Sequence, residues 1–236
     1  MITYTTTTPT PAPIASVICQ GLQVELQHRL DDISSVQDDR AQEYIFMEGD
    51  PSANVFEVLE GVVLLSKLTV DGRRQVMGFV YPGQIFGLGM SELSGYTAET
   101  VTCSKLRRYS RRTLDQSMTL FPTLGRRFLD WAGSELAAAQ NQMLLLGRKT
   151  AMEKLASFLL HLSERNEEYD QDPTLLYVPM TRTDIADYLG LTMETVSRTI
   201  SKLKQLDVIQ CCEQGYIKVC DRDRLMDLAE DEAGFL

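Results

Sequence analysis

The spacing of apolar positions along this 236-residue chain changes between its two halves. Between residues 44 and 109, short apolar runs alternate with Gly- or Pro-containing turn sequences about every ten residues. The runs are rich in β-branched and aromatic residues, and they predict strands at Val55–Leu59, Val62–Leu68, Gln75–Val80 and Thr97–Cys103. Regular strand–turn spacing of this kind is typical of a β-sandwich or jelly roll.

Helical periodicity follows the strands. A short helix is expected over Leu114–Leu120, ended by Phe121-Pro122, and a long helix over Thr123–Leu146. Apolar side chains recur along the long helix at alternating spacings of three and four residues, which is the seam of a coiled coil. Its members are Leu129, Ala132, Leu136, Ala139, Met143 and Leu146.

The long helix has two possible partners for its apolar residues. A neighbouring flank, made of Phe128, Trp131 and Leu145, can pack on the chain's own roll. A helix buried within one subunit would also be apolar, but the regular seam and its small residues favour a parallel homodimer. We therefore expect a dimerisation helix.

A hinge is expected at Gly147–Lys149, where the long helix gives way to a second helix. One face of that second helix is apolar and consists of Ala151, Leu155, Phe158, Leu159 and Leu162. An acidic surface loop over Asn166–Pro173 and a short strand over Leu175–Pro179 should follow.

Residues 181–205 predict two helices joined by a tight turn. Thr181 and Asp184 have the spacing of a capping box, in which each side chain bonds the other's backbone N–H. Gly190 can end the first helix because glycine accepts a positive φ. Thr192 is a suitable N-cap for the second helix.

The second of these helices divides into two stripes. Val196, Ile200 and Leu203 form an apolar stripe, and the polar stripe consists of Glu194, Ser197, Arg198 and Ser201. An ordinary surface helix could carry such polar residues. Here strands over Val208–Cys212 and Tyr216–Val219 follow, with Gly215 at the turn, so the complete unit predicts a winged helix-turn-helix.

The polar stripe has the chemistry needed to read DNA. An α-helix fits the major groove, where Arg198 can donate two hydrogen bonds to guanine and Glu194 can accept one from cytosine. Backbone phosphates are contacted by hydroxyls and cations, which position a protein without specifying sequence. The candidate DNA-binding residues are Thr181, Arg182, Thr192, Met193, Glu194, Thr195, Ser197, Arg198 and Lys202.

The net charge of −10 argues against non-specific coating of nucleic acid, although it allows a local reader. Residues 181–205 hold four basic and three acidic side chains, and residues 105–112 hold five basic and no acidic ones. We expect a modest phosphate contribution, so that two half-sites are needed for useful affinity.

The cysteines and histidines do not indicate a metal or catalytic site. Cys19, Cys103, Cys211, Cys212 and Cys220 are odd in number and lack C-x-x-C spacing, which fits free thiols in a reducing cytoplasm. His28 and His161 have no partners at ligand spacing. No nucleophile–base pair or phosphate-binding glycine loop supports an enzyme.

The N-terminal residues, MITYTTTTPTPAP, lack the basic region and apolar core of a signal peptide. We expect a disordered tail over residues 1–19 and a short helix over residues 20–33. No apolar run is long enough for a membrane span, so a membrane location is not expected.

The chain resembles the CRP/FNR family, named after the cyclic-AMP receptor protein and the fumarate–nitrate reduction regulator. The motifs that carry the resemblance are EGD at 48–50, EG at 60–61, DGR at 71–73, PGQIFGL at 82–88 and ETVSRTISKL at 194–203. The resemblance covers about residues 20–230. It implies that Glu194, Ser197 and Arg198 contact bases in an FNR-type TTGAT half-site, a reading that the apolar Met193 also favours.

Two departures from the family pattern bear on cofactors. The family's cyclic-nucleotide cassette has a glutamate and an Arg-Ser pair where this chain has Leu88 and Tyr96-Thr97. An iron–sulfur cluster usually needs four thiolates, and only Cys19 and Cys103 lie in the N-terminal half. The pattern that remains is similar to the FixK group of nitrogen-fixation and microoxic regulators, which implies no cofactor.

The sequence therefore predicts an α+β protein with an N-terminal β-roll, a long dimerisation helix and a C-terminal winged helix-turn-helix. The expected boundaries are a tail at 1–19, the roll at 20–122, the dimerisation helix at 123–147 and the DNA-binding domain at 148–236. The expected function is a cytoplasmic homodimeric transcriptional activator that binds palindromic double-stranded DNA and recruits RNA polymerase. The alternative is a regulator of the same fold gated by a small effector, haem or cysteine oxidation.

Overall fold

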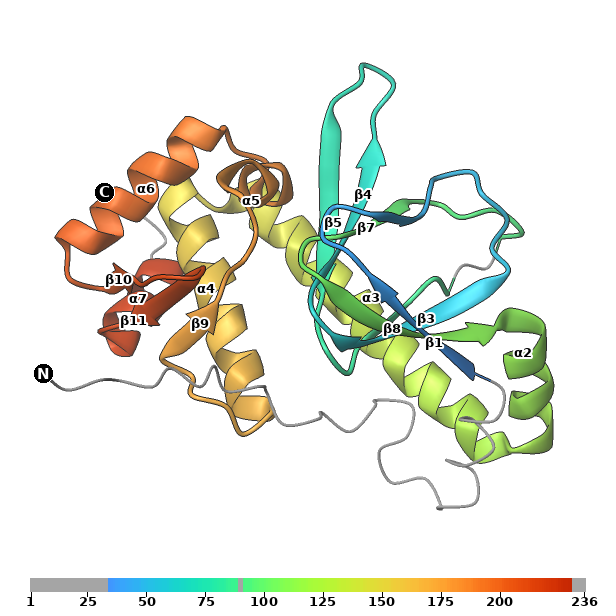
Figure 1. Ribbon diagram of the computed structural model, residues 1–236. Helices are drawn as coiled ribbons and strands as arrows, with labels where there is room; N and C mark the ends of the chain where they lie inside the picture. Colours follow the sequence, from blue (N-terminus) through green and yellow to red (C-terminus); the bar gives the residue numbers. More distant parts are fainter. Residues whose placement is uncertain (1–33, 89–90, 231–236) are drawn as a thin grey trace, which may run out of the picture.

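The structure is a computed structural model that describes residues 34–88 and 91–230. The expected tail, the expected helix over residues 20–33, Cys19 and His28 lie outside the described residues. The described chain forms a β-roll and a smaller α/β unit, with one long helix running between them (Figure 1).

Two four-stranded antiparallel sheets form the roll, as the turn spacing predicted. One sheet has the order β1-β8-β3-β6 and the other β2-β7-β4-β5. The strands are β1 (Ser34–Asp39), β2 (Tyr44–Phe46), β3 (Asn54–Glu60), β4 (Val63–Leu68), β5 (Arg74–Val80), β6 (Ile85–Phe86), β7 (Thr97–Thr100) and β8 (Ser104–Ser110). The four predicted strands correspond to β3, β4, β5 and β7, although β7 ends at Thr100, three residues early.

Strand β8 was missed because most of it lies in the basic run at 105–112. In the structure it pairs with both β1 and β3, so it lies inside its sheet rather than at an edge. Leu106 and Tyr109 are fully buried in two different apolar clusters, on opposite faces of the strand, while Arg108 is exposed.

The long helix α3 (Pro122–Arg148) follows the short helix α2 (Arg111–Leu120). Proline occupies the first turn of α3, a position where its missing N–H costs nothing. The helix continues through Gly147, and the break before α4 (Ala151–Glu168) lies at Lys149–Thr150, later than the predicted start of the hinge. Thr150 and Glu153 form a capping box that fixes the start of α4.

The C-terminal unit contains α4, β9 (Leu175–Tyr177), α5 (Arg182–Leu189), α6 (Met193–Gln205), β10 (Ile209–Cys211), β11 (Tyr216–Val219) and α7 (Arg222–Glu230). Its three strands pair antiparallel in the order β10-β11-β9. Helix α4 runs into the predicted acidic loop, where the buried Asn166 amide donates to the carbonyl groups of Asp172 and Leu175 at 2.9 and 3.0 Å.

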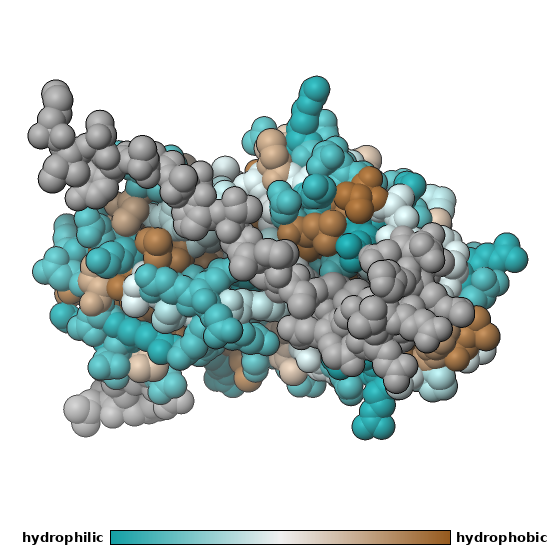
Figure 2. All heavy atoms as spheres, turned by 60° about the horizontal axis from the view of Figure 1, so that its bottom comes forward, coloured by the Kyte–Doolittle hydropathy of each residue, from teal (hydrophilic) through white to brown (hydrophobic). Residues whose placement is uncertain are grey.

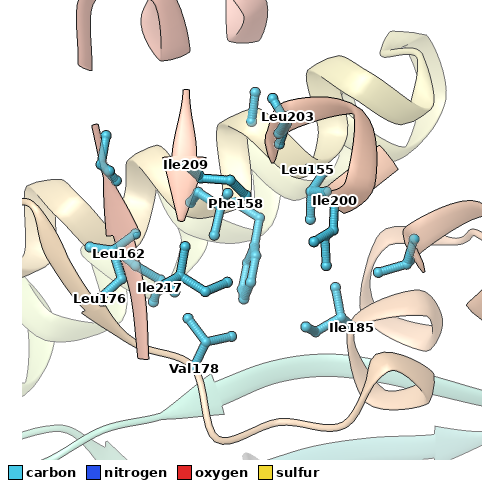
Figure 3. Packing of buried hydrophobic residues seen from close by; sticks show 14 of the residues in the cluster. Leu155, Phe158, Leu162, Leu176, Val178, Ile185, Ile200, Leu203, Ile209 and Ile217 are labelled. Atoms are coloured by element: carbon cyan, nitrogen blue, oxygen red, sulfur yellow. The ribbon is translucent and has the colours of Figure 1, made fainter. Parts of the chain in front are cut away.

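The core of this unit joins its helices to its sheet. Figure 3 shows Leu155 and Phe158 of α4 directed toward the same interior as Ile200 of α6 and Ile217 of β11. The prediction of an apolar face on α4 is therefore confirmed, except that Ala151 is only half-buried.

Within the described residues, no helix is long and apolar enough to cross a membrane. The face of the molecule seen in Figure 2 is mainly hydrophilic, and its apolar side chains lie in separate patches.

Gly61 and Gly49 provide a matched pair for testing the roll, since both have a left-handed φ, of +89° and +91°. A Cβ at Gly61 would lie 2.6 Å from the Cys103 carbonyl oxygen, whereas a Cβ at Gly49 would meet nothing within 4 Å. We expect Gly49→Ala to lower the free energy of unfolding by about 1 kcal/mol and Gly61→Ala by roughly 3 kcal/mol or more. Urea titration measures both, and equal losses would contradict the close approach.

Candidate DNA interface

Helices α5 and α6 form the helix-turn-helix, and each predicted cap is present. The Thr181 hydroxyl accepts from the Asp184 N–H at 3.1 Å, and the Asp184 carboxylate accepts from the Thr181 N–H at 3.0 Å. Gly190 ends α5 with a φ of +61°. The Thr192 hydroxyl then accepts from the Thr195 N–H at 3.2 Å, which sets the first residue of α6.

The inner face of α6 is the predicted apolar stripe. Val196 and Leu203 are fully buried and Ile200 nearly so, and all three belong to the core shared with Ile185 and Leu189 of α5. This burial fixes the rotation of α6 about its own axis, because turning the helix would expose these side chains to water.

The outer face of α6 presents polar groups to solvent. Glu194, Arg198 and Lys202 are exposed and follow one another at intervals of one helical turn. Met193 is exposed, while Ser197 and Thr195 are half-buried. Within the part of the chain that the structure describes, neither Glu194 nor Arg198 belongs to a salt bridge, so both can engage a ligand.

Glu194 is held in its ionised form, which can only accept hydrogen bonds. Hydrogen bonds from its own backbone N–H and from the Thr192 hydroxyl hold the pKa of Glu194 below its ordinary value, with a smaller contribution from Arg198. The Arg198 guanidinium also donates to the Thr195 hydroxyl at 3.4 Å. The side chains at the start of α6 thus form one connected polar group with an anionic acceptor and a cationic donor.

The remaining candidates lie near the helix N-termini. Thr181 is exposed and Arg182 half-buried at the start of α5, and Thr192 is exposed at the start of α6. The unpaired N–H groups of a helix N-terminus favour anions, so both positions suit backbone phosphates.

Several aromatic side chains cluster inside the roll. Phe56 stacks on Phe86 with ring centroids 5.3 Å apart, and Phe46 lies 5.6 Å from Tyr96. The Tyr96 hydroxyl accepts from the Gly87 N–H at 2.8 Å, and burial raises the pKa of this phenol, which therefore stays neutral. A neutral phenol thus occupies a position where the resemblance would place an arginine.

The described cysteines are free thiols and are spread over two regions. Cys103 lies on the roll, whereas Cys211, Cys212 and Cys220 lie on or beside the wing strands β10 and β11. No group of three or more metal-ligating side chains occurs among residues 34–88 and 91–230.

Two known domains match this chain. The Crp-like helix-turn-helix domain matches residues 153–228, and the cyclic nucleotide-binding domain matches residues 39–119. These are the two units seen in the fold, a DNA-reading unit joined to a roll, and together they define a class of transcriptional regulator.

Relatives of known function match over nearly the whole chain. The nitrogen fixation regulation protein FixK of Bradyrhizobium diazoefficiens is 36% identical over 91% of this chain and 90% of the relative. The transcriptional activator protein FnrL of Cereibacter sphaeroides is 33% identical over 92% and 89%, respectively. The solved structure of FixK2 from Bradyrhizobium japonicum superposes with a TM-score of 0.79 at 35% identity, covering 85% of this chain and all of that one.

The chain therefore belongs to the CRP/FNR family of transcriptional regulators. The relatives described above are regulators of the FixK and FNR type, which are transcription factors and not enzymes.

The N-cap of α6 gives a prediction about the interface. Thr192→Ala removes the acceptor for the Thr195 N–H and should lower the free energy of unfolding by about 1 kcal/mol. Thr192→Ser keeps that acceptor and serves as the control. Urea titration compares the two variants, and an alanine variant as stable as the serine variant would rule out the cap.

Proposed function

We infer that the chain is a transcriptional activator that binds, as a homodimer, a palindrome of TTGAT-type half-sites. The observation that carries this proposal is the exposed pair Glu194 and Arg198, one turn apart on a helix whose other face is locked into the core. Such a helix can enter the major groove with its N-terminal side chains against base edges.

The proposal for the regulated genes rests on the chain's relatives. Its relatives are named as nitrogen fixation regulators and as transcriptional activators, and their spans cover most of the chain. We assign the protein to the control of microoxic, anaerobic or nitrogen-fixation genes. Its partners are double-stranded DNA and RNA polymerase in the cytoplasm, and it needs no cofactor.

Dimerisation is supported by the surface of α3. Leu129, Leu136 and Met143 are 74%, 62% and 73% exposed, and Ala132 and Ala139 between them are exposed as well. An apolar stripe of this kind on a long helix is covered when a second copy packs along it.

The C-terminal end of that stripe differs from the rest. Leu146 is half-buried, and one of its methyl groups lies 3.3 Å from where a Cβ on Gly190 would stand. We therefore place the dimer contact mainly on the five earlier seam residues, with Leu146 shared between the seam and the reader unit. Phe128 and Trp131 pack on the roll, whereas Leu145 packs on the reader core.

Substitutions of the two proposed base-reading residues should change DNA binding in different ways. Arg198→Ala should remove the preference for a TTGAT palindrome over unrelated DNA, since a bidentate arginine–guanine contact is worth roughly 1–3 kcal/mol in each half-site. Glu194→Ala should leave binding in place but relax the preference at one base pair. Fluorescence anisotropy with single-base operator variants measures both effects.

Lys204→Ala is the control for these variants, because Lys204 is exposed at the other end of the same helix. Operator preferences in both variants that matched the control would remove the assignment of α6 as the reader.

The seam can be tested by charge insertion. Leu129→Asp combined with Leu136→Asp should give a monomer, because two buried carboxylates would face their counterparts across the dimer. Leu68→Asp is the control, since Leu68 is 64% exposed but lies on the roll. Sedimentation analysis gives the mass, and a double variant that remained dimeric would disprove the seam.

A further inference from the structure

Helix α5 is held by side chains from outside its own unit. The last carbonyl groups of an α-helix have no partner within it. In α5, the Asp187 carbonyl accepts from the Gln75 amide of strand β5 at 2.7 Å, and the Tyr188 carbonyl accepts from the Gln142 amide of α3 at 2.9 Å. The roll and the dimerisation helix therefore each complete one end group of the first helix of the reader.

Arg74 adds an ionic contact between the same elements. Its Nε donates to the Asp187 carboxylate at 2.8 Å, and a terminal nitrogen donates to the Asp184 carboxylate. Asp184 and Asp187 are three residues apart and lie on one face of α5, which faces the β4–β5 hairpin (Figure 1). One guanidinium thus connects the roll to two points on the reader.

This ion-pair group is only partly open to solvent. The side chains of Arg74, Asp184 and Asp187 are 31%, 13% and 25% exposed. Burial lowers the pKa of Arg74, but the bonds to Asp187 and Asp184 together raise it above its ordinary value. The planar guanidinium can satisfy both carboxylates at once, which an ammonium group cannot do as well.

Apolar contacts lie beside the polar ones. The ring of Phe79 on β5 lies 5.3 Å from Tyr188 of α5 and 6.2 Å from Phe158 of α4. On its other side, α5 packs Ile185 and Leu189 into the core that also contains the inner stripe of α6. The position of α6 therefore depends on α5, and the position of α5 depends on the roll and on α3.

The covalent link between α3 and α4 cannot set this position alone. The two helices are separated by Lys149 and Thr150, both in extended conformation with ψ values of 144° and 169°. A two-residue extended link restrains the angle between two helices only weakly, so lateral contacts are needed to fix it.

We propose that Arg74 is a positioning residue for operator binding and that Gln75 and Gln142 assist it. Together they fix the angle between the reader unit and the dimerisation helix, and this angle sets the separation of the two α6 helices in the dimer. This rests on the proposed binding of a palindrome by a homodimer. If the angle is fixed, both reader units can bind at one half-site spacing without losing further conformational entropy. If the angle is variable, the dimer can bind at several spacings, but each binding event costs entropy and the affinity is lower.

The test uses the full-length protein and palindromes in which the spacer between half-sites is varied by single base pairs. Arg74→Ala should weaken binding at the preferred spacing by roughly three- to thirtyfold and should reduce the discrimination between spacings. The loss caused by a base change inside a half-site should stay the same. Fluorescence anisotropy gives the affinities, and sedimentation analysis verifies that the variant is dimeric.

Arg73→Ala is the matched control. Arg73 is the preceding residue, its side chain is 82% exposed, and among the described residues its only ion pair is the local one with Asp71 at 2.7 Å. We expect it to behave like the unmodified protein. Gln142→Ala is a second test variant, because it loosens the same helix from the side of α3 without leaving unpaired carboxylates.

The outcomes separate the two proposals. If Arg74→Ala and Gln142→Ala lower affinity equally at all spacings, or match Arg73→Ala, positioning by Arg74 is disproved while palindrome binding stands. If the unmodified protein binds a palindrome no better than a single half-site, the proposed function fails and the positioning role fails with it. Loss of spacing discrimination in both variants, with dimer mass retained, supports the proposal.

Discussion

The architecture depends on the burial of one face of α6. Val196, Ile200 and Leu203 enter the core of the C-terminal unit, and the helix can satisfy them in only one rotation. That rotation leaves Glu194 and Arg198 in solvent without a salt-bridge partner in the described chain. Hydrophobic burial thus sets the direction in which the polar side chains point. The caps at Thr192 and Gly190 determine which residues begin α6 and end α5. The polar surface that we propose reads DNA is thus produced by an apolar constraint on the opposite side of the helix.

The same separation of roles appears in α3. Phe128 and Trp131 bind the helix to the roll, Leu145 binds it to the reader core, and Leu129, Leu136 and Met143 stay uncovered. One helix therefore contacts both units of its own chain and still carries a free apolar stripe. Because α3 also supplies the Gln142 amide to the Tyr188 carbonyl, the element proposed to join two subunits is bonded directly to the helix that supports the reader.

The parts of the structure that follow local rules could be predicted from the sequence. Thr181, Gly190 and Thr192 act on backbone groups within a few residues, so spacing alone identified them. Strand β8 was missed because its buried residues are interspersed with basic ones, and the hinge was placed too early because Gly147 is helical and the Thr150–Glu153 box was overlooked. Arg74 gave no signal, since its partners lie more than a hundred residues away and nothing in the local pattern pairs them.

The roll itself bears on how such a regulator is controlled. A cavity that waits for an anionic effector would have to keep donors unsatisfied until the ligand arrives, at a cost in stability. Here the Gly87 N–H already has the Tyr96 hydroxyl as its acceptor, and Phe46, Phe56 and Phe86 pack around the same interior. The roll consequently gains its stability from its own side chains. The roll also offers a surface to α5, where Arg74, Gln75 and Phe79 contact the reader unit. That surface is the support that we propose for the position of the reader unit.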